Sequence, residues 1–232
     1  VNDGIIATKL GLTGIPDLAE KIIIERDLSL LQNFNCRYHI SQISSSKSIE
    51  VIRQNKNKVN FTTGVSINNL SLNENDIGDF KTFLKLSPPL RTEEDRLSLI
   101  NGINKDLIDV IVSDHKPEDE ESKRITFSQA ATGASGVETF LSLALEMFHN
   151  GSVKLSKIIK LVTTNPAKIL KINKGNLSIG NDADFCIVDL YKPWVVKKEN
   201  MYSKSKNTCI EDKRIQGLVT NTFVKGNELF KI

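Results

Sequence analysis

From Val1 to about Leu170 the chain alternates short apolar runs with longer segments of helical periodicity, and this alternation constrains the fold more than any other feature. β-Branched and aromatic residues are typical of strands, whereas an apolar face repeating every three to four residues is typical of helices. Strands alternating with helices form βα units, so the pattern predicts a parallel sheet covered by helices. The expected strands are Cys36–Ile43, Val59–Val65 and Val110–Val112, and the expected helices include Pro16–Phe34 and Ser46–Gln54.

Capping residues and apolar spacing predict where other helices begin and which faces they bury. Thr92 can cap a helix with Asp95 three residues on, and Asn165-Pro166 has the residue types of a cap and a first helical position. We expect Leu97 and Ile100 to turn inward on the helix after Thr92. Two further apolar faces are expected to be buried: Leu18, Ile22, Ile23 and Leu31 on the helix Pro16–Phe34, and Val137, Phe140, Leu141, Ala144 and Phe148 on a helix Val137–Phe148.

After Gly175 the pattern changes to short strands and turns. Such spacing is typical of a small β structure rather than of more βα units. The sequence therefore predicts two parts, a partial (β/α) barrel over residues 1–174 and a β region over residues 175–232. The strands expected in the second part are Ala183–Leu190, Trp194–Lys197, Gln216–Val224 and Glu228–Ile232.

The composition is that of an ordinary globular protein, with 39% hydrophobic and 25% charged residues in 232. The 31 basic residues are interspersed with 28 acidic ones, so no nucleic-acid surface is expected. The three cysteines, Cys36, Cys186 and Cys209, lie far apart, which argues against a disulfide framework and favours the cytoplasm. No apolar run reaches the roughly 18 residues that a membrane span requires. Since the chain begins at Val1 without leader character, we expect a fragment of a longer reading frame.

Ser113-Asp114-His115 is the strongest candidate for a catalytic site, because it follows a buried strand. The carboxyl ends of barrel strands carry catalysis, and Asp and His can bind a metal or move protons. An aspartate that caps a loop beside a structural histidine is the alternative. His39 is expected at the end of its strand, His149 is expected to be structural, and Asp3-Gly4 could be a simple turn. The segment Lys85–Arg91 ends in a cation that could grip a carboxylate or lie on the surface.

Several motifs occur in a fixed order along the chain. They are Asn2-Asp3-Gly4, Leu10–Pro16, Ala19-Glu20, Arg26-Asp27, Lys85–Arg91 with Glu94-Asp95-Arg96, Ser113–Pro117, Phe127, Gly133–Thr139, Thr164–Ala167, Gly180–Asp184 and Ser203–Thr208. Together they resemble the dihydroorotases of the amidohydrolase superfamily, and in particular their multifunctional-complex type and its alphaproteobacterial branch. The resemblance covers essentially the whole chain.

The resemblance implies the C-terminal part of a distorted (β/α)8 barrel of the metal-dependent hydrolases, with a small β-rich composite domain. The implied activity is the reversible conversion of N-carbamoyl-L-aspartate to L-dihydroorotate in pyrimidine (UMP) synthesis, with one or two zinc ions that polarise the carbonyl and activate water. By resemblance Asp114 carries the proton, and Asp3, His39 and Asp114 bind metal. The implied substrate-binding residues are Ser87, Arg91, His115, Gly133 and Gly136.

The sequence also departs from the family at several positions. The HxH pair of the first barrel strand has no counterpart in this chain, and Gln42 stands where the second histidine of an HxxH-like stretch is expected. Asn68 and Asn69 replace a His-His pair, and an amide is a weaker zinc ligand than imidazole. Ser87 replaces an asparagine, and Glu118 replaces a histidine where a carboxylate would repel a dianionic substrate. These departures mark either a subgroup or a loss of activity.

Three functions remain open at this point. The first is a dihydroorotase whose other half lies outside this chain. The second is a non-catalytic homologue that serves as a structural partner of aspartate transcarbamoylase, and the third is another cyclic amidohydrolase such as a hydantoinase or allantoinase. Lys85–Arg91 and Ser203–Thr208 favour dihydroorotase over the third. Half a barrel would expose unpaired strand edges, so we also expect a homo-oligomer, aggregation or dependence on the missing half.

Overall fold

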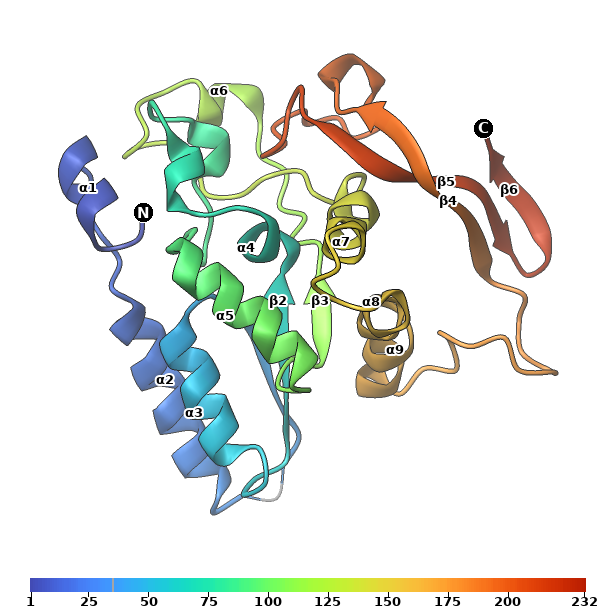
Figure 1. Ribbon diagram of the computed structural model, residues 1–232, viewed down its shortest axis with the longest axis horizontal. Coiled ribbons are helices and arrows are strands. Elements are labelled where there is room, and N and C mark those ends of the chain that lie inside the picture. Colours follow the sequence, from blue (N-terminus) through green and yellow to red (C-terminus); the bar gives the residue numbers. More distant parts are fainter. Residues whose placement is uncertain (35) are drawn as a thin grey trace.

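A parallel sheet forms the centre of the protein, as Figure 1 shows for the computed structural model, which describes residues 1–34 and 36–232. Its strands pair in the order β1-β2-β3, and each is joined to the next by helices that cross over one face. The predicted strands and crossovers are confirmed. They are β1 (Tyr38–Ile43), α3 (Ser46–Asn55), β2 (Phe61–Ser66), α4 (Ile67–Ser71), α5 (Glu93–Asn104) and β3 (Val110–Val112).

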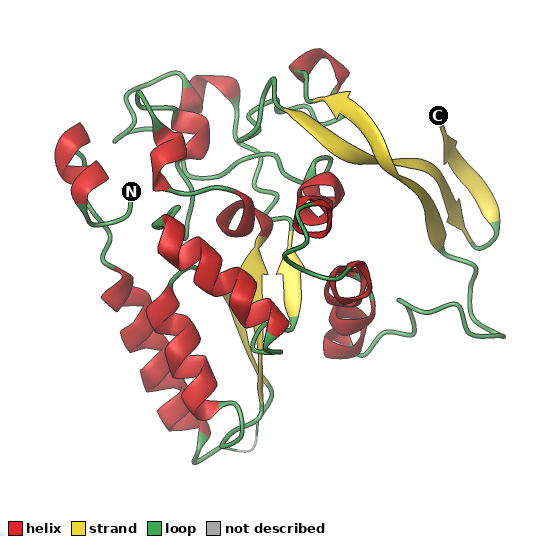
Figure 2. Ribbon diagram, viewed as in Figure 1, coloured by secondary structure: helices red, strands yellow, loops and turns green. Residues whose placement is uncertain are grey.

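Further helices lie on both sides of this sheet and beyond its carboxyl end, and a second sheet lies to one side (Figure 2). The helices and 3-10 turns are α1 (Ile5–Leu10), α2 (Asp17–Leu31), η1 (Glu74–Ile77), η2 (Thr82–Leu84), α6 (Glu120–Lys123), α7 (Phe140–His149), α8 (Leu155–Val162), α9 (Thr164–Leu170) and η3 (Lys198–Asn200). The second sheet is antiparallel with the order β4-β5-β6. Its strands are β4 (Phe185–Val195), β5 (Arg214–Val224) and β6 (Asn227–Lys231).

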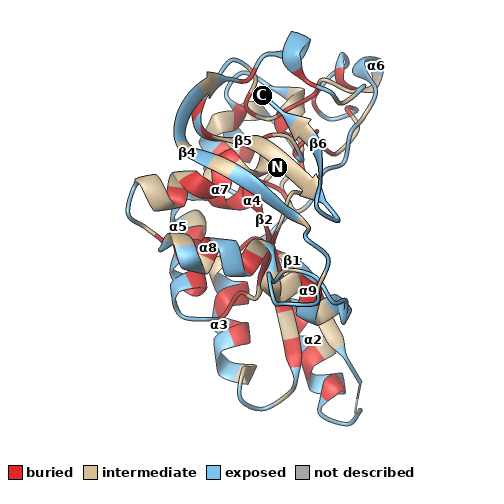
Figure 3. Ribbon diagram, turned by 90° about the vertical axis from the view of Figure 1, so that its right-hand side faces the viewer, coloured by how far each residue is buried: buried red, intermediate tan, exposed pale blue. Residues whose placement is uncertain are grey.

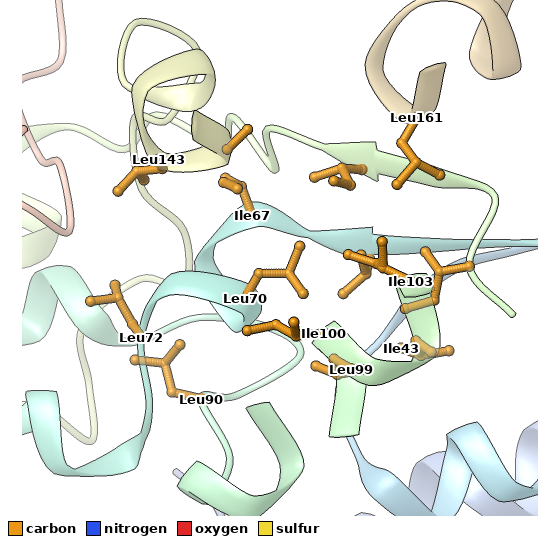
Figure 4. Packing of buried hydrophobic residues seen from close by; sticks show 14 of the residues in the cluster. Ile43, Ile67, Leu70, Leu72, Leu90, Leu99, Ile100, Ile103, Leu143 and Leu161 are labelled. Atoms are coloured by element: carbon orange, nitrogen blue, oxygen red, sulfur yellow. The ribbon is translucent and has the colours of Figure 1, made fainter. Parts of the chain in front are cut away.

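The main core lies between the parallel sheet and its crossover helices. Figure 4 shows Ile43 of β1 beside Leu99 and Ile103 of α5, and the three side chains are fully buried. Burying an aliphatic side chain of this size stabilises a fold by about 1.5–3 kcal/mol. Buried residues therefore concentrate on the inward faces of the helices, as Figure 3 shows along α3 and α7.

Local signals set the helix starts that the sequence predicted. Thr92 accepts a hydrogen bond from the backbone of Asp95, and the Asp95 carboxylate accepts one back from the backbone of Thr92, so the predicted cap is a complete capping box. Asn165, by contrast, is not a cap, because α9 already begins at Thr164. The Asn165 side chain instead donates to the carbonyl of Asp109, just before β3.

Two predicted helix faces were partly wrong. On α2 the buried residues are Ile24, Leu28 and Leu31, whereas Leu18, Ile22 and Ile23 are exposed. Since α2 is apolar on more than one side, spacing alone could not select the side that packs on the sheet. Other errors have the same origin: Leu97 and Val137 are exposed, α7 begins at Phe140, and its buried residues are Ser142, Leu143, Ala144, Leu145 and Met147.

The second sheet packs on α7 through a small polar contact. Ser142 of α7 donates to the carbonyl of Gly217 in β5, and the indole nitrogen of Trp194 donates to both. The prediction that Trp194 begins a separate strand was wrong, because β4 runs on through a bulge between Asp189 and Pro193. Pro193 is tolerated there since β4 is an edge strand of its sheet.

In the part of the chain that the structure describes, no helix is long and apolar enough to cross a membrane. The division of the chain between residues 174 and 175 stays a prediction.

Candidate active site

The carboxyl ends of the three parallel strands bring together Gln42, Ser66 and Asp114. Gln42 is the second-last residue of β1, Ser66 is the last residue of β2, and Asp114 follows β3 by two residues. The Gln42 amide nitrogen donates to Oδ1 of Asp114 at 2.9 Å, and the Ser66 hydroxyl lies 3.5 Å from Oδ2. Asp114 has a φ of 49°, a left-handed conformation that is uncommon outside glycine and concentrates at functional sites.

Burial raises the pKa of Asp114 above its ordinary value. The hydrogen bonds from Gln42 and Ser66 act in the opposite direction, but they are the smaller effect. A carboxylate exchanges protons best when its pKa approaches the working pH. The surroundings of Asp114 therefore move it towards general acid–base chemistry.

The segment Gly133–Val137 packs directly on the loop that carries Asp114. His115 pairs with Ala134 in an isolated bridge, and Nδ1 of His115 accepts hydrogen bonds from the backbone of Gly136 and Val137. A Cβ on Gly133 would lie 2.6 Å from the Lys116 carbonyl oxygen, and one on Gly136 would lie 2.6 Å from that of Ser113. Both glycines are thus required for the close approach of two backbones.

Asn207 joins this pair of loops to the C-terminal part of the chain. Its amide oxygen accepts from the backbone of Glu118, its amide nitrogen donates to the carbonyl of Gly133, and its carbonyl accepts from the backbone of Ser135. Asn207 is buried, so these bonds are shielded from water. Glu118 itself is half-buried and lines a hollow of about 600 Å³ with residues from 203 to 207.

His39 does not lie at this site. It is the second residue of β1 and pairs with Thr62, whereas Val112 pairs with Ser66, four residues further along β2. At about 3.3 Å per residue, His39 is roughly 13 Å from the carboxyl end of the sheet. The predicted position of His39 at the strand's end was therefore wrong, and Gln42 is the side chain of β1 that contacts Asp114.

Arg91 is buried and lies within a structural network. Its guanidinium donates to the Ser44 hydroxyl, the Asn2 side chain and the carbonyl of Ile15. This network holds the first residues of the chain, with Asp3, against the segment that follows β1. Asp3 is exposed at this point. The structure thus gives Arg91 a positioning role rather than the open cation that the sequence suggested.

The remaining predicted residues lie around this end of the sheet. Ser87 is exposed and precedes a cis peptide bond to Pro88. Asn68 and Asn69 are buried in α4; Asn69 donates to the carbonyl of Pro89, while the Asn68 amide nitrogen and the Asn69 amide oxygen have no partner among the described residues. The two asparagines are therefore buried side chains of α4.

The donor set around Asp114 does not fit a zinc site. Zinc prefers imidazole, thiolate and carboxylate, whereas the groups that contact Asp114 are an amide nitrogen and a hydroxyl. Within residues 1–34 and 36–232, no three His, Cys, Asp or Glu side chains gather closely enough to hold a metal. Any zinc held at this end of the barrel would need ligands from outside the chain.

The sequence did not reveal the contact of Gln42 and Ser66 with Asp114. The pairing register of the strands determines this contact, because residues at or near the carboxyl ends of neighbouring parallel strands lie at the same edge of the sheet. The bulge between Ile40 and Ile43 shifts that register, which hides it from simple counting.

The chain is similar to known proteins over nearly its whole length. The model of the amidohydrolase family matches residues 4–229. The chain belongs to the amidohydrolase family. Within that family it is 40% identical to a dihydroorotase from Ehrlichia chaffeensis, over 100% of this chain and 52% of the relative. It is 38% identical to a dihydroorotase from Thermoanaerobacter sp., over 100% of this chain and 54% of the relative.

Two solved structures have the same fold over this chain. An L-hydantoinase from Arthrobacter aurescens has a TM-score of 0.87 at 27% identity, and a dihydropyrimidinase from Brevibacillus agri has a TM-score of 0.87 at 20% identity. Each match covers 93% of this chain and 49% of the solved chain. The predicted fold class, α/β with part of a (β/α)8 barrel, is confirmed, and the chain spans about half the length of the relatives it matches.

Proposed function

We propose that this chain supplies the Asp114 side of a dihydroorotase-type active site, and that the whole protein interconverts N-carbamoyl-L-aspartate and L-dihydroorotate. The observation that carries the proposal is Asp114 itself, half-buried at the carboxyl end of β3 with a raised pKa and two neighbouring hydroxyl and amide donors. Sequence similarity to dihydroorotases over the entire chain supports this substrate over other cyclic amides.

Asp114 would act as the proton carrier. In hydrolysis a water molecule attacks the ring carbonyl, the carbon–nitrogen bond breaks, and the ring nitrogen leaves with a proton. A carboxylate that accepts the proton from water and delivers it to the nitrogen serves both steps. The hydrogen bond from Gln42 fixes one carboxylate oxygen, which leaves Oδ2 with only the long contact to Ser66 and free for this transfer.

The same proposal includes zinc as the cofactor, the cytoplasm as the location and an oligomer as the assembled form. Zinc would polarise the carbonyl and activate water, with its ligands supplied by the half of the barrel that this chain lacks. A homo-oligomer or a complex with aspartate transcarbamoylase would cover surface that the described residues leave open.

The test is hydrolysis of dihydroorotate by the whole reading frame in which this sequence lies, with added zinc. Asp114→Asn should lower kcat by about 10²–10⁴-fold, the range for removing a positioned acid–base group. Asp106→Asn is the matched control, because Asp106 is an exposed aspartate with a similar left-handed φ of 56° far from the site. Equal rates in the two variants would contradict the role of Asp114.

A second function is favoured by one observation, the amide of Gln42 bonded to Asp114 where a metal-binding imidazole is expected. We propose as this alternative a non-catalytic structural partner of aspartate transcarbamoylase. A folded whole protein that binds aspartate transcarbamoylase, and that shows no hydrolysis before or after the Asp114→Asn change, would favour this alternative over the enzyme.

A further inference from the structure

Gln42 is held in place by the fold and not by a flexible loop. It lies in the bulge of β1 between Ile40 and Ile43, and the flanking residues Ile40 and Ile43 are buried and pair with β2. Its amide nitrogen meets Oδ1 of Asp114 at 2.9 Å across the end of the sheet. The side chain therefore points at the carboxylate in a defined geometry.

This geometry opposes zinc binding at Asp114. An ionised carboxylate only accepts hydrogen bonds, so the amide must turn its N–H towards Oδ1. An amide nitrogen offers no lone pair to a metal, and its proton occupies one of the acceptor positions of Oδ1. Imidazole in the same place would offer a lone pair and is a preferred ligand of zinc.

None of the three histidines of the chain supplies the zinc ligand that Gln42 does not supply. His39 is roughly 13 Å from the carboxyl end of the sheet, and its Nδ1 is hydrogen-bonded to Thr62. His115 follows Asp114, but its Nδ1 accepts from the backbone of the Gly133–Val137 segment. His149 ends α7 and lies between the rings of Phe148 and Tyr191.

We propose that residue 42 decides whether Asp114 takes part in holding zinc: Gln42 occupies Oδ1 and supplies no lone pair beside the carboxylate, so Oδ2 alone does not retain the metal. The carboxylate is thereby left as a hydrogen-bonded proton carrier. The inference rests on the proposed function only in treating Asp114 as part of the active site. It predicts that one substitution, Gln42→His, creates a zinc site that includes Asp114.

The experiment measures the zinc content of the whole reading frame by mass spectrometry after incubation with zinc and dialysis, without substrate. Gln42→His should hold about one zinc per chain more than the unchanged protein, and adding Asp114→Asn should remove that gain. Gln42→Leu breaks the hydrogen bond without supplying a ligand, so it should gain none. Cobalt(II) in place of zinc should give new visible absorption bands in Gln42→His alone.

Two results would overturn the inference: a folded Gln42→His protein with no added zinc, or an unchanged protein that loses zinc on Asp114→Asn. Near-ultraviolet circular dichroism checks whether Gln42→His folds. The second comparison changes only Asp114, so it tests the inference even if Gln42→His does not fold. Because zinc is counted without turnover, a gain of zinc in a protein that never hydrolyses dihydroorotate would refute the proposed function and leave this inference standing.

Discussion

At the residue scale, chemistry at the site depends on side chains a few residues apart along β1. His39 and Gln42 differ by three positions, yet one lies near the start of the strand and the other contacts Asp114. His39 was predicted as a metal ligand because it is a histidine. The strand register instead places Gln42 beside the carboxylate of Asp114. Asp114 could be predicted from the sequence because a buried strand ends beside it. Its partners could not, since a bulge in β1 sets which residue reaches it.

Tyr38 gives a pH dependence that can be measured directly. Burial, with the hydrogen bond that the tyrosine donates to Asp27, raises the pKa of Tyr38 from 10.0 to about 12. In the unfolded chain the tyrosine ionises near its ordinary pKa, so between pH 10 and about 12 the folded state binds more protons than the unfolded state. The stability that Tyr38 contributes should be complete below pH 10 and lost as the pH rises towards 12.

Urea unfolding between pH 9 and pH 11.5, compared with Tyr38→Phe, measures this contribution. The unchanged protein should lose free energy of unfolding more steeply with pH than the variant, and one of its three tyrosines should ionise late by ultraviolet absorbance. Parallel pH profiles for the two proteins would show that the hydrogen bond to Asp27 does not hold the proton.

At the element scale, Gly64 fixes how β1 and β2 pair. A Cβ at this position would lie 2.3 Å from the backbone carbonyl oxygen of Ser41 and 3.2 Å from a methyl group of Val110. Because the carbonyl belongs to the strand backbone, it can give way only if the sheet shifts. Gly64→Ala should therefore lower the free energy of unfolding by about 1–3 kcal/mol, as overpacking does in other cores.

Gly4→Ala is the control for that measurement. Gly4 has an extended φ of 165°, and a Cβ there would meet only the Asn2 side chain at 3.7 Å. Chemical denaturation should show a loss of stability for Gly64→Ala and little change for Gly4→Ala. Equal effects would mean that the loss reflects helix and strand propensity rather than the contact with Ser41.

The elements themselves were largely predictable, whereas their contacts were not. Capping residues and alternating apolar runs are local signals, so β1, β2, β3, α3 and α5 were found within a few residues. Which side of α2 is buried depends on the sheet beneath it, and the placement of Arg91 depends on Asn2 and Ser44, which are distant in sequence. No window of neighbouring residues contains that information.

At the scale of the whole molecule, the parallel sheet has two open edges. Among the described residues β1 and β3 each pair on one side only, and α2 exposes Leu18, Ile22 and Ile23. Unpaired strand edges beside exposed apolar side chains favour association. The chain expressed alone should therefore aggregate or dimerise, as measured by light scattering after gel filtration.

Co-expression with the remaining half of the barrel should restore a single species in the same measurement. A monodisperse monomer of the isolated chain with cooperative unfolding would contradict this expectation. It would mean that the open edges are already protected in solution.

The bonds of Asn207 have a consequence for how the protein is made. Synthesis proceeds from the amino end, and Asp114 leaves the ribosome long before Asn207 does. Until Asn207 emerges, the backbone groups of Glu118, Gly133 and Ser135 lack the hydrogen bonds that this residue makes to both loops. The carboxylate loop is thus finished late, by the part of the chain that contributes no group to Asp114. A messenger shortened before this codon would encode Asp114 without the hydrogen bonds of Asn207 that join the neighbouring loops.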